Sequence, residues 1–117
     1  MEKATSSNSI GALWFAIVNV MDSELYSKYV EKAAQPVKMH GGILLARSNQ
    51  SYSIENLPKE ARRVVTIGFP SEEDARNCFY STAYQAARKH RVGVAQTELF
   101  ILSLASGKRL YLESTAD

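Results

Sequence analysis

Four segments of this 117-residue chain are rich in apolar residues that do not alternate strictly with polar ones, and this property constrains the fold more than any other. The segments are rich in β-branched and aromatic residues, which is typical of strands. They cover residues 12–20 (ALWFAIVNV), 43–47 (ILLAR), 63–69 (RVVTIGF) and 97–104 (TELFILSL). In a half-solvated antiparallel sheet, apolar residues alternate with polar ones. Here both faces of the predicted sheet are hydrophobic, so both faces need a cover.

An amphipathic helix is predicted between the first two strands, over residues 23–39. Apolar side chains recur there at helical spacing: Tyr26, Tyr29, Val30, Ala33 and Val37. Asp22 supplies the N-cap oxygen, and residues 40–42 (HGG) are typical of a left-handed helix C-terminus. Pro36 gives no amide hydrogen to the preceding turn, so we expect it to kink or loosen the end of the helix.

A second helical region follows the third strand. Ser71 and Asp74 fit a capping box at its start, and the apolar pattern breaks at residues 81–82 before it restarts at Tyr84. Two short helices in series are therefore predicted. The resulting order β-α-β-β-α-β is that of a ferredoxin-like α+β fold, a four-stranded antiparallel sheet with its helices on one face.

The second face of this sheet has no helix to cover it. If about eight large apolar side chains stayed in water, the chain would forgo about 1.5–3 kcal/mol for each, which is comparable to the net stability of a whole domain. A second copy of the same sheet, packed face to face about a two-fold axis, would cover it. We therefore predict a homodimer that forms an α/β barrel.

The length of the chain fits one domain, which we expect over residues 10–105. The polar residues 1–9 are expected to form a flexible N-terminal arm. Residues 106–117 are expected to form a C-terminal extension, with a candidate edge strand at 109–113.

Charge and cysteine content exclude several classes of protein. The chain has 14 Lys or Arg and 12 Asp or Glu residues, and the net charge of +2 is too small for a dedicated nucleic-acid binder. Its longest apolar stretch, residues 10–21, is far short of the ~20 residues that cross a bilayer, so no membrane partner is expected. The single cysteine, Cys78, excludes a disulfide scaffold and suits a reducing compartment, which predicts a cytoplasmic location.

Several short strings also occur in a specific order along the chain. They are Asp22 followed by Tyr26 and Tyr29, residues 40–42 (HGG) before 45–47 (LAR), residues 69–71 (FPS), and residues 81–85 (STAYQ) leading to Arg88. Together, over residues 13–104, they resemble the family called domain of unknown function 1330, in the dimeric α/β-barrel superfamily. The resemblance implies a ferredoxin-like protomer that dimerises through its sheet, and it implies no agreed activity. Related members of the superfamily include haem-degrading and quinone-forming monooxygenases and small isomerases.

Arg47 and Glu55 are the most informative polar residues. An arginine at the end of an apolar strand must reach solvent or meet a carboxylate. Two alternatives follow: Arg47 forms an internal salt bridge with Glu55, or it orients the carboxylate or phosphate of a substrate. The resemblance picks out both residues without assigning roles to them.

Tyrosines and basic residues supply the other candidates. Tyr26 and Tyr84 carry hydroxyl groups on apolar bodies, which suits the wall of a small-molecule pocket, with core packing as the alternative. Core packing is our expectation for Tyr29. The basic run 88–91 (RKHR) is expected to be solvated, with anion binding by Arg88 or Arg91 as the alternative. Neither histidine, at positions 40 and 90, has the spacing of a metal ligand, so no metal and no cofactor are expected.

These observations predict a homodimer with a pocket in each protomer for a small anionic or aromatic metabolite. Tyr26, Arg47 and Tyr84 would line the pocket, with Asn19, Glu55 and Arg88 as further members. If the chain is an enzyme, we expect cofactor-independent acid/base chemistry, with Glu55 as the base, Arg47 as the anion clamp and Tyr26 or Tyr84 as the proton donor. The alternative is a non-catalytic binding or structural dimer in which Arg47 and Glu55 pair with each other.

Overall fold

The computed structural model describes residues 9–48, 54–55 and 63–104. Its elements are β1 (Ala12–Val20), α2 (Ser23–Met39), β2 (Ile43–Ser48), β3 (Arg63–Phe69), α3 (Glu72–Tyr80), α4 (Thr82–Arg88) and β4 (Ala95–Ser103). All strand pairs are antiparallel, in the order β2-β3-β1-β4. The predicted ferredoxin-like α+β fold is confirmed. The candidate edge strand at 109–113 and residues 1–8 of the predicted arm lie outside the described residues.

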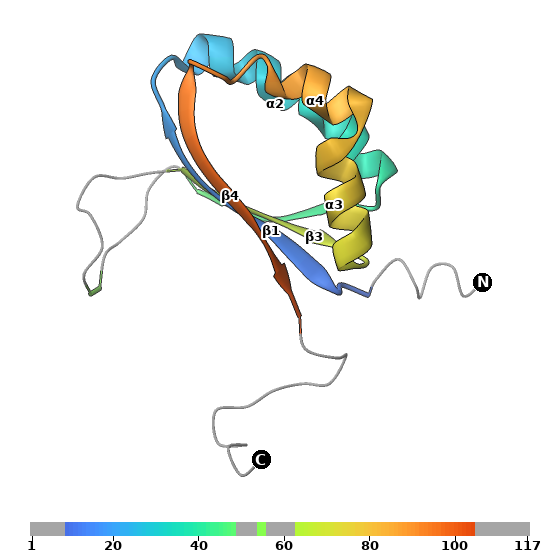
Figure 1. Ribbon diagram of the computed structural model, residues 1–117. Coiled ribbons are helices and arrows are strands. Elements are labelled where there is room, and N and C mark those ends of the chain that lie inside the picture. Colours follow the sequence, from blue (N-terminus) through green and yellow to red (C-terminus); the bar gives the residue numbers. More distant parts are fainter. Residues whose placement is uncertain (1–8, 49–53, 56–62, 105–117) are drawn as a thin grey trace.

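The helices and the sheet form two layers. Figure 1 shows α2, α3 and α4 on one side of a curved sheet, with α2 and α4 side by side. The main core lies between the layers, where Trp14 on β1 contacts Phe69 and Tyr84 with ring centres 5.2 and 5.1 Å away. Small buried residues of α3, Ala75 and Cys78, allow that helix to pack closely on the aromatic rings.

Helix α2 begins and ends where the sequence predicts. The Asp22 carboxylate accepts a hydrogen bond from the backbone amide of Leu25 at 3.1 Å. The helix runs through Pro36 to Met39, and the Pro36 carbonyl accepts hydrogen bonds from the His40 amide and from His40 Nδ1. Gly41 then takes a φ of +84°, a left-handed conformation that favours glycine.

The predicted break in the second helical region is the junction of α3 and α4. The side chain of Ser71 caps α3 by accepting from the Asp74 amide. Ser81 ends α3 in an extended conformation, and its hydroxyl oxygen accepts from the amide of Tyr84 in the first turn of α4. The extended Ser81 separates the two helices and positions Tyr84 in the core.

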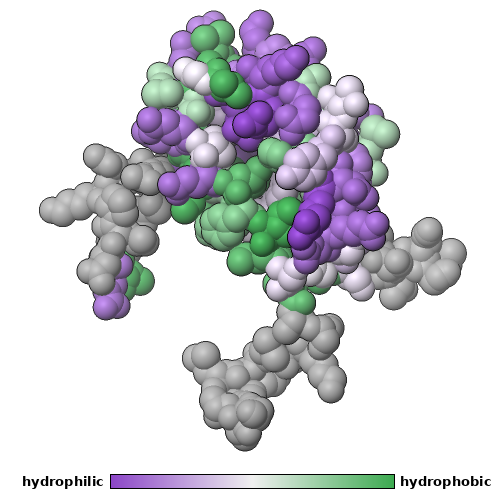
Figure 2. Space-filling view, in the orientation of Figure 1, coloured by the Kyte–Doolittle hydropathy of each residue, from purple (hydrophilic) through white to green (hydrophobic). Residues whose placement is uncertain are grey.

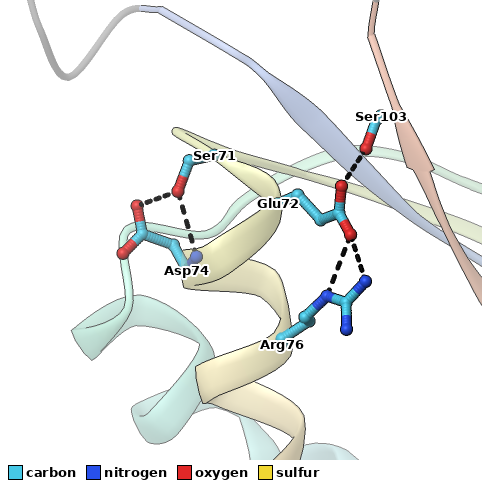
Figure 3. Close-up of polar contacts among 5 residues, drawn as sticks. All are labelled: Ser71, Glu72, Asp74, Arg76 and Ser103. Carbon is cyan, nitrogen blue, oxygen red and sulfur yellow. Dashed lines mark hydrogen bonds and ion pairs between the residues drawn. The ribbon is translucent and has the colours of Figure 1, made fainter.

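A polar contact ties α3 to the end of β4. Figure 3 shows the Glu72 carboxylate between Arg76, one turn along α3, and the hydroxyl of Ser103 on β4. These interactions hold one end of the helical layer against the edge strand of the sheet.

The other side of the sheet presents apolar side chains with no described element over them. We call this surface the open face. Its large apolar residues, placed by strand pairing, are Leu13, Phe15, Ile17, Ile43, Val64, Phe100 and Leu102. Phe100 is 45% exposed and contacts Phe15 with ring centres 5.3 Å apart. Figure 2 shows hydrophobic side chains gathered below the helices, along the course of β4 in Figure 1.

No helix in the described ranges is both long enough and apolar enough to cross a membrane.

Candidate functional site

A cavity of about 390 Å³ lies between α2 and the inner face of the sheet. Most of its wall is aliphatic or aromatic. The apolar lining comes from β1, α2, β2, β3 and β4: Trp14, Val18, Val30, Ala33, Ala34, Val37, Leu44, Val65, Ile67 and Leu99. A volume of this size accommodates a small organic molecule.

Three tyrosines, Tyr26, Tyr29 and Tyr84, bring hydroxyl groups to this apolar wall. The hydroxyl oxygens of Tyr29 and Tyr84 are 2.6 Å apart and share a hydrogen bond. Burial, with Tyr84 beside it, raises the pKa of Tyr29 above its ordinary value of 10.0. Burial also raises the pKa of Tyr26, against the opposing effect of Arg63 and Arg91. Tyr26 and Tyr29 therefore stay protonated at neutral pH and can donate hydrogen bonds.

The charged residues of the lining all carry positive charge. They are Lys38, Arg47, Arg63 and Arg91, and no aspartate or glutamate is among the described residues that line the cavity. Two of the arginines stack on tyrosine rings, with guanidinium carbons 5.0 Å (Arg63 over Tyr26) and 5.2 Å (Arg91 over Tyr29) from the ring centres. The cavity thus combines an apolar wall with four cationic side chains.

Arg91 is the most buried of these cations, at 7% exposed. One of its terminal nitrogens, Nη2, donates to the Tyr84 hydroxyl oxygen at 3.2 Å. Burial lowers the pKa of the guanidinium, but the contacts with Tyr84 and Tyr29 raise it more, so the group stays charged. Two buried atoms of the lining, Nε of Arg91 and Oγ1 of Thr97, have no hydrogen-bond partner within the part of the chain that the structure describes.

Arg47 reaches the cavity because β2 is irregular. The pairing of β2 with β3 shifts by one residue between Leu44 and Ala46. In an unbroken ladder Arg47 would lie opposite Val64, on the open face. The shift places it opposite Val65, whose side chain lines the cavity.

The structure brings together three of the six predicted site residues: Tyr26, Arg47 and Tyr84 line the cavity. Asn19, Glu55 and Arg88 are not in the lining. The Asn19 amide nitrogen is 3.4 Å from the side-chain oxygen of Gln96. The guanidinium carbon of Arg88 lies 5.7 Å from the centre of the Phe79 ring, and the Glu55 side chain is exposed.

The predicted alternative, a salt bridge between Arg47 and Glu55, is not among the ion pairs of the described residues. In the described residues the ion pair is that of Arg76 with Glu72, and none joins Arg47 to Glu55. Arg47 is directed to the cavity by the shift in β2, whereas Glu55 is solvent-exposed. Within the part of the chain that the structure describes, no ion pair accounts for Arg47.

Sequence reasoning did not assign Arg63, Thr97 or Tyr29 to the site, and it favoured a solvated position for Arg91. The expectation for Arg91 is wrong, since its side chain is buried. A usable signal exists in the sequence: Tyr84, Ala87 and Arg91 follow one another at the i, i+3, i+7 spacing of one helix face.

The residues that could hold a metal are scattered. Within the described ranges no three His, Cys, Asp or Glu side chains gather at one place. His40 uses its Nδ1 atom in the hydrogen bond to the Pro36 carbonyl, 2.7 Å away.

Comparisons with known proteins give a family and a fold. The family model described as "Domain of unknown function (DUF1330)" matches residues 11–105. A protein of unknown function from Rhodopseudomonas palustris has 18% identity and a TM-score of 0.67, covering 89% of this chain and 92% of that one. SnoaB, a cofactor-independent oxygenase from Streptomyces nogalater, has 10% identity and a TM-score of 0.57, covering 89% and 98%.

A hypothetical Arabidopsis thaliana protein has 15% identity and a TM-score of 0.56, covering 86% of this chain and 94% of that one. A search of curated proteins found no match. At such identities the structural likenesses show the fold alone.

Proposed function

The chain belongs to the DUF1330 family, as its sequence strings predicted, and we propose that it binds a small organic anion with an apolar body in the cavity beneath α2. The observation that carries this proposal is the lining itself. Four cationic side chains and no described acidic one surround a space whose wall is otherwise aliphatic and aromatic.

Electrostatics favours an anion over a neutral ligand. A buried charge without an opposite partner is costly, because the low-dielectric interior replaces its hydration poorly. Among the described residues, the groups that stabilise the Arg91 charge are Tyr84 and Tyr29. A carboxylate entering the cavity would pair with it, while the aliphatic and aromatic wall would remove the rest of the ligand from water.

We propose that the protein acts as a homodimer joined through the open face. The side chains there are apolar like those of the inner face, and a second sheet is the cover that fits their chemistry. A cytoplasmic location also stays a proposal, supported by the buried thiol of the single cysteine.

Catalysis without a cofactor is a second candidate, favoured by the hydrogen bond between the Tyr29 and Tyr84 hydroxyl groups, which can hold a proton beside a bound anion. SnoaB is described as a cofactor-independent oxygenase and shares the fold at 10% identity. The described lining offers proton donors but no carboxylate or imidazole base. Glu55 as the base therefore stays a prediction, and binding is the function that the geometry supports best.

Calorimetric titration with benzoate, phenylacetate and hexanoate tests the binding proposal, each acid being compared with its neutral amide. We expect at least one carboxylate to saturate one site per chain and to change the fluorescence of Trp14, the only tryptophan of the sequence, which lines the cavity. The matching amide should bind at least about tenfold more weakly, because it lacks the charge.

A blocking variant and a matched control locate the binding. Ala34 is exposed yet lines the cavity, whereas Ala86 on α4 is exposed and does not. Ala34→Phe should abolish the titration signal, and Ala86→Phe should leave it unchanged. Failure of all three carboxylates to bind the wild-type protein, or equal binding to both phenylalanine variants, would refute the proposal.

A further inference from the structure

We propose that Arg91, Thr97 and the Tyr29–Tyr84 pair form a carboxylate seat in the buried part of the cavity, and that the ligand is a monocarboxylate whose acid group enters first. This inference rests on the proposed binding function and names the residues and the ligand class that the family match leaves unassigned.

The seat lies at the buried end of the lining. Tyr84 is fully buried and Arg91 is 7% exposed, whereas Lys38 and Arg47 are exposed residues. The cationic lining is therefore graded, with one charge deep among aromatic rings and others near solvent. The single positive charge of buried Arg91 therefore favours a ligand with one negative charge at the buried end of the cavity.

The guanidinium of Arg91 has N–H donors without an acceptor among the described residues. A guanidinium carries five N–H groups in a rigid plane. Nη2 donates one hydrogen to Tyr84, while Nε, buried, donates to no group in the described part of the chain. The Nε–H and the adjacent Nη hydrogen form the planar fork that binds both oxygens of a carboxylate.

The tyrosine pair leaves one further donor. Two hydroxyl groups hold two protons, and the hydrogen bond between the Tyr29 and Tyr84 oxygens uses one of them, whichever group donates. The second proton is available to a ligand. The buried hydroxyl of Thr97, also without a described partner, adds another group that can donate.

The donors and the charge of the seat together indicate the ligand class. The groups of the seat that have no described partner can all donate a hydrogen bond, and Arg91 gives the seat one positive charge. A carboxylate supplies two oxygens with about four acceptor positions and one negative charge, so it satisfies them. A phosphate ester brings more than one negative charge at neutral pH, and an amide directs its own N–H groups at the guanidinium. The apolar wall beyond the seat then takes an aromatic or aliphatic body.

Titrations with benzoate test the seat through three variants. Thr97→Val keeps the shape and the strand propensity, and we expect it to weaken benzoate binding about 2- to 10-fold. Arg91→Met keeps the apolar stem without the charge and should weaken binding about 10- to 100-fold. Arg91→Lys keeps the charge without the planar fork and should fall between wild type and Arg91→Met. Lys32→Met, which removes an exposed charge outside the lining, should bind benzoate like the wild type.

The outcomes separate the seat from the binding function. Retained benzoate affinity in both Thr97→Val and Arg91→Met, with Ala34→Phe still blocking, would overturn the seat and leave the binding function intact. Absence of carboxylate binding in the wild type would refute the binding function first. Circular dichroism and the melting temperature identify any variant that fails to fold, and the isosteric Thr97→Val then decides the result.

Discussion

Arg91 shows how strongly the surroundings of one residue decide its role. Its neighbours Lys89 and His90 are exposed, and a basic run of this kind is usually solvated. The chain bends into β4 just after this run, which places Arg91 under α2 against Tyr29 and Tyr84. The sequence shows that Arg91 and Tyr84 are spaced to lie on one helix face. The burial of Arg91, however, depends on contacts with residues that are distant in the chain.

Cys78 is expected to be chemically inert in the folded protein. Its side chain is fully buried in the core, and burial raises the pKa of the thiol to about 12, so almost no thiolate forms at pH 8. Ellman's reagent should label the native protein at pH 8 only on the timescale of unfolding, and should label it within minutes in urea. Rapid stoichiometric labelling of the native protein would contradict this placement.

The raised pKa of Tyr29 predicts that the folded protein loses stability at high pH. Its folded pKa lies above the ordinary value of 10.0, so above pH 10 the unfolded chain releases a proton that the folded chain keeps. The free energy of unfolding should therefore be constant below pH 10 with respect to this group and fall as the pH rises beyond it. Urea titrations between pH 8 and 11.5 measure the slope.

The Tyr29→Phe variant isolates this effect. It should show a shallower decline above pH 10 than the wild type, while Tyr80→Phe, at a 75% exposed position, serves as the matched control. An unchanged slope in Tyr29→Phe would show that the phenol of Tyr29 is not buried.

At the level of elements, hydrophobic periodicity and the residues that mark helix and strand ends predicted most of the fold. β1, α2 and β3 have the bounds that their sequence patterns predict, because caps and turn residues mark their ends. The shift in β2 has no such marker. It depends on the pairing of β2 with β3, so the sequence predicted Arg47 in the pocket without showing which irregularity of the strand directs it there.

Ser81 joins two elements and should matter more than its polarity suggests. Its hydroxyl oxygen caps the first turn of α4, so Ser81→Ala should lower the free energy of unfolding by about 1 kcal/mol. The control is Ser27→Ala in α2, where the hydroxyl only donates back to the Glu24 carbonyl and the change should stay within about 0.5 kcal/mol. Equal urea midpoints for the two variants would show that the Ser81 cap contributes no stability.

At the level of the whole molecule, the two faces of the sheet have different requirements. The inner face is covered by α2, α3 and α4 (Figure 1). The cavity lies between α2 and this face. The open face leaves Phe100 and Leu102 more than 40% exposed. An apolar surface of this extent is typical of a protein interface.

The Phe100→Asp variant tests the homodimer. Wild-type protein at micromolar concentration should elute with twice the 13.0 kDa mass of one chain in light scattering. Phe100→Asp places a charge in the open face and should give the single-chain mass, because an unpaired charge is costly in an apolar interface. Leu25→Asp, at an exposed apolar position on α2, should stay dimeric. A monomeric wild type would refute the dimer.

The proposed ligand is a small apolar carboxylate whose acid group binds in the cavity beneath α2. A crystal structure of the protein with 4-bromobenzoate, in which anomalous scattering locates the bromine, tests this proposal most directly. We expect the carboxylate oxygens within hydrogen-bond distance of Arg91 Nε and Thr97 Oγ1, with the bromine among the apolar residues of the wall. A bromobenzoate bound only outside the cavity, or bound inside it with its acid group away from Arg91, would refute the carboxylate seat.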